Sequence, residues 1–194
     1  MNPKWTQKEM AKVAAEERGA LGLNLMDPLD PYLLAEKWGI PVYPISVLAD
    51  EDCPNETIEH FRTTSSKRWS AALVPLGRGR IIIENDSHQT VRRRSSVAHE
   101  MSHHLLEHVF PEGVLASDHD KLYSKAVEKQ ALFMSGELLA PNAACQKLAF
   151  RDADNAAVAA RFNISTQMAQ MQMKGPRSYA KHALAKQARA RRPR

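Results

Sequence analysis

The chain has 194 residues, of which 43% are apolar and 25% are charged, and its mean hydropathy is −0.45. These values predict a soluble protein with one core of ordinary size. No stretch of the sequence approaches the 18 or more apolar residues of a membrane span, and this excludes a membrane-spanning helix.

The formal net charge of +5 is concentrated at the C-terminal end. Residues 174–194 contain eight Lys and Arg residues and no Asp or Glu, and without them the chain has 19 basic and 22 acidic residues. A basic tail can bind nucleic acid by releasing counterions. Two expectations follow: weak nucleic-acid contact through the tail, or a flexible end that only adds solubility.

The cysteine pattern favours a reducing compartment. Cys53 and Cys145 lie far apart and form no C-x-x-C motif, so two free thiols are expected. The N-terminal residues include Lys4, Lys8 and Lys12 and no apolar segment, so no secretory signal peptide is expected. A cytoplasmic location is therefore predicted.

The first half of the chain is expected to form helices and a small sheet. Thr6 is a suitable N-cap for the first helix, and Asp30 followed by Pro31 opens the second, which Gly39 ends. The expected elements in this half are a helix over residues 1–25, a helix over 32–38, an edge strand over 40–45, and strands over 69–74 and 80–84.

The second half is expected to be helical. The expected helices cover residues 88–108, 123–139, 142–150, 154–162 and 165–173. The last two form a helix-turn-helix-like pair, which Gly175 and Pro176 should end. We expect a main domain over residues 1–150, a helix-turn-helix-like appendage over 151–175, and a flexible basic tail over 176–194.

A His-Glu-x-x-His motif lies in the helix predicted over residues 88–108. Residues four apart share one helix face, so His99 and His103 can bind one metal ion, and Glu100 can reach a water beside it. The residues around the motif are mostly apolar, which indicates a buried site: Val97, Ala98, Met101, Leu105 and Leu106.

A catalytic zinc site needs a third protein ligand and an open position. The extended metalloprotease pattern with a third histidine is excluded, because Leu106 and Val109 stand where it requires Gly and His. His104 and His108 lie about 100° and 140° around the helix from His103. Both are therefore predicted to be structural or solvent-facing.

A carboxylate from the next helix supplies the third ligand in our prediction. Glu128 shares a helix face with the small residues Ala131 and Ser135, which allow two helices to approach closely. Glu137, nine residues later, points to the opposite side. The predicted zinc ligands are therefore His99, His103 and Glu128.

Two segments resemble the ImmA/IrrE-type metallo-endopeptidases. Residues 92–103 read RRRSSVAHEMSH, and residues 128–141 read EKQALFMSGELLAP, against the family patterns A-H-E-[LIM]-[GS]-H and E-x-x-A-x-x-F-A-x-x-L-L-x-P. The similarity extends from about Asp30 to Met173. The departures from the pattern concern packing positions: Ser95, Met134, Ser135 and Ala140.

The resemblance implies an α+β, mainly helical, zincin-like metalloprotease domain with a small sheet and a C-terminal helix-turn-helix-like pair. It also implies a zinc-dependent endopeptidase whose relatives cleave a helix-turn-helix transcriptional repressor and so switch on a mobile-element or stress regulon. The expected partner is therefore a protein substrate.

The expected chemistry assigns the remaining roles. Glu100 is predicted to take a proton from the attacking water. Tyr123, His119 and Arg92 are candidates for the oxyanion donor, although Arg92 with its two neighbours also fits a solvated basic cluster. An extended substrate is expected to pair with a strand edge, from residues 80–84 or 69–74.

The alternative is a non-catalytic, metal-stabilised module that binds a protein partner or DNA. The second helix of the C-terminal pair has no basic residue before Lys174, and its methionines are typical of packing against protein. Packing or substrate docking is therefore favoured for this pair over direct reading of DNA.

Overall fold

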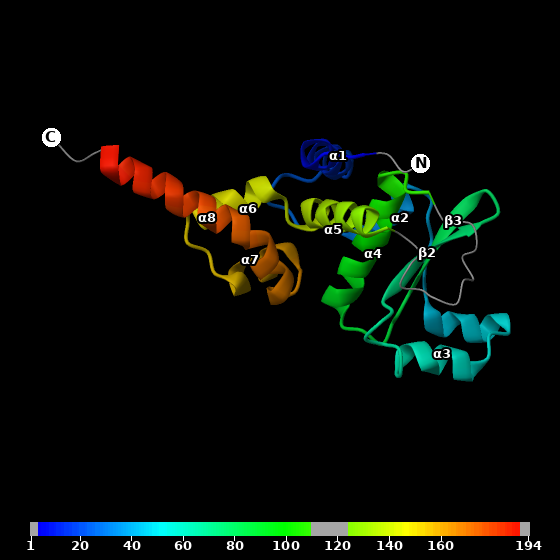
Figure 1. The fold of residues 1–194 in the computed structure, drawn as a ribbon. Coiled ribbons are helices and arrows are strands. Elements are labelled where there is room, and N and C mark those ends of the chain that lie inside the picture. The colour runs from blue at the N-terminus through cyan, green and yellow to red at the C-terminus, as the bar shows by residue number, and fades with distance from the viewer. Residues whose placement is uncertain (1–3, 110–123, 191–194) are drawn as a thin grey trace.

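The computed structural model describes residues 4–109 and 124–190, and its helices and small mixed sheet confirm the predicted α+β class (Figure 1). The elements in chain order are α1 (Gln7–Ala20), α2 (Pro31–Lys37), β1 (Val42–Pro44), the 3₁₀ helix η1 (Ile45–Glu51), α3 (Asn55–Arg62), β2 (Ala71–Leu76), β3 (Gly79–Glu84), α4 (Thr90–Leu105), α5 (Lys125–Leu139), α6 (Asn142–Ala149), α7 (Asn155–Phe162) and α8 (Thr166–Ala190).

The sheet has the strand order β1-β3-β2. β3 pairs antiparallel with β2 and parallel with β1, so the predicted hairpin and the predicted edge strand are both confirmed. Gly77 turns the hairpin with a φ of +58°, where any side chain would be strained. Because β3 has a strand on each side, the prediction that residues 80–84 offer a free edge is wrong.

The first two helices begin where the sequence predicts. Thr6 caps α1 in a capping box with Glu9, and Asp30 caps α2 by accepting from the N–H of Tyr32. Gly39 follows α2 with a φ of +64°. α1 itself ends at Ala20, earlier than predicted. The N–H groups of Leu21, Gly22 and Leu23 donate to carbonyl oxygens of its last turn.

The core lies around α4 and α5. α4 packs against α5, α2 and both long strands, and Figure 1 shows it crossing between the sheet and the helices of the second half. Its buried apolar side chains lie on the faces of the helix beside the two histidines of the motif. Their packing therefore fixes the rotation of α4 about its axis and the direction of the histidines. They are Val97, Ala98 and Met101, with Leu106 just after the helix.

The arginine run at 92–94 is only partly the solvated cluster that its charge predicted, because Arg92 is exposed whereas Arg93 and Arg94 are not. Arg94 is buried and donates to the carbonyl oxygens of Leu29 (2.5 Å) and Asn163 (3.1 Å), which lie far away in the chain. Arg93 forms an ion pair with the buried carboxylate of Glu84. These contacts tie α4 to the start of α2, the α7–α8 turn and the sheet.

The prediction that Gly175 and Pro176 end the last helix is wrong, because α8 continues to Ala190. Gly175 has no Cβ to clash with the proline ring, which removes part of the usual conflict before a proline. Pro176 and Ala180 are buried, and Arg177 donates to the side chain of Asn155 (2.7 Å) and to a backbone carbonyl before α7. Packing on α6 and α7 therefore stabilises the helix across the proline.

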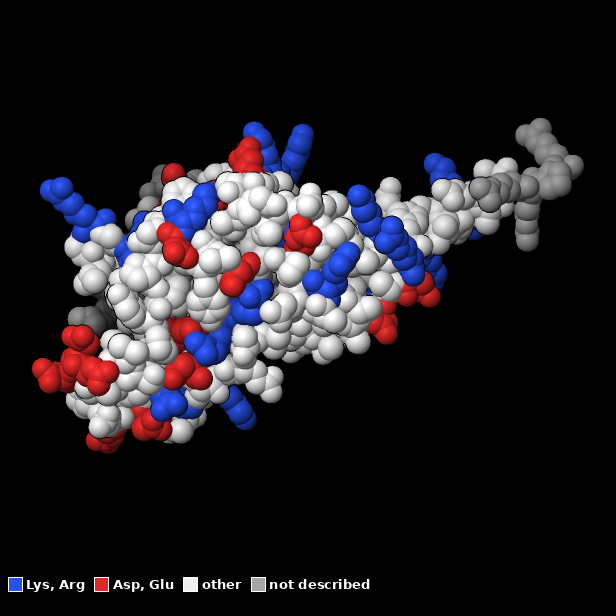
Figure 2. All heavy atoms as spheres, turned by 180° about the vertical axis from the view of Figure 1, so that it is seen from behind, with Lys and Arg blue, Asp and Glu red and all other residues white. Residues whose placement is uncertain are grey.

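The outer half of α8 projects from the body, as seen from both sides in Figures 1 and 2, and Lys and Arg side chains stand along it. Its buried residues Pro176 and Ala180 lie on one side of the helix, and the exposed Lys174 and Lys181 lie on another. Among residues 4–109 and 124–190, no helix is both long and apolar enough to cross a membrane.

Candidate active site

The two histidines of the motif face each other across one turn of α4. Their Nε2 atoms are 3.2 Å apart, and the rings meet edge to face with centroids 4.9 Å apart. His103 is buried, whereas about a quarter of the His99 side chain is exposed. The pair therefore has a buried side at His103 and a side at His99 that is accessible to solvent.

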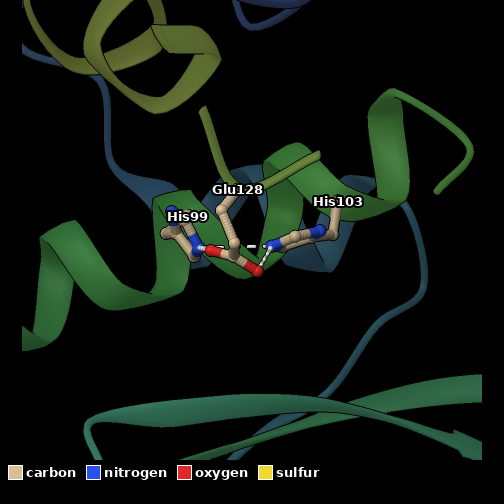
Figure 3. A group of neighbouring side chains, drawn as sticks. All are labelled: His99, His103 and Glu128. Carbon is tan, nitrogen blue, oxygen red and sulfur yellow. Dashed lines mark hydrogen bonds and ion pairs between the residues drawn. The ribbon is translucent and has the colours of Figure 1, made fainter. Parts of the chain in front are cut away.

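Glu128 completes a cluster of three metal-binding side chains (Figure 3). Its Oε2 lies 3.2 Å from Nε2 of His99, and its Oε1 lies 3.6 Å from Nε2 of His103. Glu128 stands in the first turn of α5, which Ser124 caps. The carboxylate lies between the two rings, as helix phase predicted, and the ligand atoms of all three residues lie within 4.8 Å of one another.

Glu137 lies elsewhere, also as predicted. Both of its oxygens lie 3.3 Å from the backbone N–H of Asn142, at the start of α6. Burial raises the pKa of Glu137, and the hydrogen bond from Asn142 opposes this effect. Glu137 therefore stabilises the α5–α6 junction and takes no part in the cluster.

The spacing of the cluster fits a tetrahedral metal ion. Bonds of about 2.0–2.1 Å at tetrahedral angles place neighbouring ligand atoms about 3.3 Å apart. The three observed separations are 3.2, 3.2 and 3.6 Å. Two imidazole nitrogens and a carboxylate therefore form a donor set that could hold a divalent metal ion with one position open.

Glu100 points from α4 towards the sheet. Its Oε2 accepts a hydrogen bond of 2.9 Å from the backbone N–H of Leu73 in β2. Burial raises the pKa of Glu100 to about 7, while the neighbouring His99 and the Leu73 N–H act in the opposite direction. A carboxyl group with this pKa can take up and release a proton near neutral pH.

The two histidines differ in their electrostatic surroundings. Burial, together with the charges of His99 and His108, lowers the pKa of His103 to about 2. Burial also acts to lower the pKa of His99, but its hydrogen bond to Glu128 and the charges of Glu100 and Glu128 raise the pKa overall. A neutral His103 keeps a nitrogen lone pair for a metal ion.

Comparison with known families decides the class of the protein. The family model of the IrrE N-terminal-like domain, peptidase family M78, matches residues 43–174. The chain belongs to this family. No curated protein matches the chain.

Membership of the M78 family supports a metallopeptidase-type function. The matched region begins in β1 and ends inside α8, so it contains β2, β3, both helices of the cluster, α7 and the first part of α8. The resemblance recognised in the two sequence segments is thereby confirmed.

The candidate oxyanion donors do not lie in the described part of this M78 site. The guanidinium of Arg92 donates to the carbonyl of Ser66 (3.2 Å) and the hydroxyl of Ser70 (2.8 Å), two helical turns from His99. His119 and Tyr123 lie outside the described residues.

His104 is structural, as predicted. Its ring packs edge to face on Trp38, and its Nδ1 lies 2.9 Å from a guanidinium nitrogen of Arg80. Burial lowers its pKa, with a further contribution from the charge of Arg80. Both contacts direct His104 away from the metal cluster.

His108 is the residue whose part in the site the sequence did not indicate. It is buried, its Nδ1 lies 2.9 Å from Nδ1 of His103, and its Nε2 lies 3.0 Å from Oε1 of Gln130. Helix phase placed it far from His103 because the helix was assumed to reach residue 108. α4 ends at Leu105, and the turn after it, with Glu107 at a φ of +54°, brings the N–H of His108 to the carbonyl of His103.

Proposed function

We propose that this M78 protein is a zinc-dependent endopeptidase. His99, His103 and Glu128 would hold the ion, and Glu100 would act as the general base. The observation that carries the proposal is the cluster of three ligand atoms at tetrahedral spacing, with the carboxyl group of Glu100, in the same helical turn, held by the N–H of Leu73. Two histidines and one glutamate are a ligand set typical of catalytic zinc, with the fourth position left for water or substrate.

In this mechanism the ion supplies a Lewis acid that polarises the scissile carbonyl group and acidifies the attacking water. Glu100 removes a proton from that water and transfers it to the nitrogen of the departing peptide. The N–H of Leu73 holds one oxygen of Glu100, which leaves the other oxygen for the proton. α4 and β2 thus fix the base relative to the ligands.

The substrate would bind as an extended segment along β2. The N–H of Leu73 points to Glu100, away from β3, so this side of β2 faces the cluster. Among the described residues, β2 has no strand on this side, and a peptide added there would pass directly beside the base. From the family resemblance, we propose that the substrate is a helix-turn-helix transcriptional repressor.

The test combines metal content with cleavage. Glu100→Gln should keep stoichiometric zinc, measured by elemental analysis of the purified protein, and lose cleavage of co-expressed candidate repressors. Glu128→Ala should lose most of the zinc and the cleavage together. Normal cleavage by Glu100→Gln would contradict the assignment of the base, and a wild-type protein that binds no divalent metal would contradict the whole proposal.

One observation favours a second candidate function, in which the protein is a non-catalytic module that binds DNA. α8 projects from the body and carries cations such as Lys181, Lys186 and Arg189, and residues 174–194 contain no acid. Phosphate contacts of this kind weaken steeply with salt. Deletion of residues 181–194, beyond the buried Ala180, would abolish salt-sensitive DNA binding if this candidate is right, and would leave repressor cleavage intact if the protein is a protease.

A further inference from the structure

We propose that His108 is a positioning residue for His103, and that Gln130 holds His108 in the orientation this role requires. The inference rests on the proposed metal site and extends it to the residues behind it. It assigns a role to a histidine that belongs to neither the motif nor the ligand set.

The turn after α4 brings His108 back to His103. The N–H of His108 donates to the carbonyl of His103 (3.0 Å), and the N–H of Glu107 donates to the carbonyl of His104 (3.0 Å). Glu107 has a φ of +54°. These are the two hydrogen bonds and the left-handed residue of a Schellman motif. In such a motif the side chains at the positions of His103 and His108 usually make an apolar contact. Here a hydrogen bond between two imidazoles replaces that contact.

The hydrogen bonds from His103 through His108 to Gln130 favour one proton arrangement for a metal-binding His103. Its Nε2 faces the cluster and must be unprotonated to bind an ion, so in the neutral ring the proton lies on Nδ1. That N–H then donates to Nδ1 of His108, whose own proton must lie on Nε2. The N–H at Nε2 donates to the side-chain carbonyl of Gln130.

His108 is placed to support the site rather than to join it. Its two ring nitrogens contact His103 and Gln130, and the residue is 1% exposed. Gln130 lies on α5, two residues after Glu128, so the same helix supplies a ligand and the end of the hydrogen-bonded chain. Partners of this kind fix the tautomer and ring direction of a metal-binding histidine, and losing one typically lowers metal affinity about 10–100-fold.

The test measures zinc affinity of the full-length protein by competition with a chromophoric chelator, after the metal has been removed by dialysis. His108→Ala should weaken zinc binding by about 10–100-fold. His108→Asn can place an amide oxygen near the position of Nδ1 and accept from His103, so it should recover most of the affinity. His104→Ala, which changes the neighbouring histidine outside the cluster, should bind zinc as the wild type does.

Gln130→Ala and Gln130→Glu provide a second pair that does not alter the buried ring. The alanine variant should weaken zinc binding several-fold, and the glutamate variant, which keeps an acceptor, should not. In the wild type, nitrogen-detected NMR of the imidazoles should show the proton of His103 on Nδ1 and that of His108 on Nε2. Far-UV circular dichroism of each metal-free variant separates loss of the site from loss of the fold.

Two results would overturn the inference: a folded His108→Ala protein with wild-type zinc affinity, or a His108 ring that carries its proton on Nδ1. Failure of the wild-type protein to bind zinc would instead contradict the proposed function. The two failures are therefore distinguishable.

Discussion

Replacing Arg94 should destabilise the protein far more than replacing Arg92, two residues earlier on the same helix. Arg94→Met keeps most of the aliphatic stem and removes the guanidinium, which leaves the carbonyl oxygens of Leu29 and Asn163 without their donor. Each buried acceptor left unsatisfied costs about 1–3 kcal/mol. The pair with Asp30 adds little, because that side chain is 44% exposed.

The expected loss in the free energy of unfolding, summed over the two carbonyl oxygens, is therefore about 2–6 kcal/mol. For a chain of this size the midpoint of thermal unfolding falls by about 2–4 °C per kcal/mol, so the shift should reach about 10 °C. Arg92→Met is the matched control. It removes hydrogen bonds from an exposed side chain to Ser66 and Ser70, and it should cost less than about 1 kcal/mol.

The measurement is urea unfolding of both variants and the wild type, followed by far-UV circular dichroism. If Arg94→Met and Arg92→Met unfold within about 1 kcal/mol of each other, the buried contacts of Arg94 do not hold the helices together as argued. The run of arginines would then be the solvated cluster that its charge indicates.

Three further outcomes are expected. Glu107→Gly should raise the free energy of unfolding by about 1 kcal/mol, and Glu107→Ala should raise it less, because alanine keeps a Cβ at a φ of +54°; equal unfolding midpoints for the two variants would contradict this. Burial raises the pKa of Glu137, so as the pH rises above about 4.5 the unfolded chain releases this proton before the folded protein does. The free energy of unfolding of the wild type should therefore fall relative to that of Glu137→Gln. Parallel curves of stability against pH from pH 4 to 8 would refute the shift. Burial raises the pKa of Cys145 to about 11, so a thiol reagent at pH 8 should modify Cys53 alone in the folded protein and both cysteines after denaturation; rapid modification of Cys145 in the folded state would contradict its burial.

Local physical chemistry was enough to predict that the side chains of His99, His103 and Glu128 would lie together. The spacing of His99 and His103 requires only that the segment be helical, because four residues return to the same face. The choice of Glu128 over Glu137 needed only the phase of a second helix and the small residues beside it. The caps at Thr6 and Asp30 follow equally from short-range hydrogen bonding. The roles of the cluster and of Glu100 in binding and catalysis stay predictions until the variants are measured.

Helix phase could not predict the position of His108, because this residue lies beyond the end of α4. α4 ends three residues before His108, and the left-handed residue that turns the chain is a glutamate, which carries no sequence signal for such a turn. The converse error occurred at Pro176, where a residue that usually ends helices is held inside one by contacts with α6 and α7. In both places distant packing overrides the local preference.

The sequence by itself therefore determined the family, most of the elements apart from η1 and α3, and the three side chains that could hold a metal ion, since each depends on residues close together in the chain. The tertiary structure alone decided that Arg94 is buried, that β2 rather than β3 has a free edge, and that His108 stands behind His103. Each of these depends on groups that meet only after the chain has folded, and the burial of a charge or the pairing of a strand cannot be read from its neighbours in sequence.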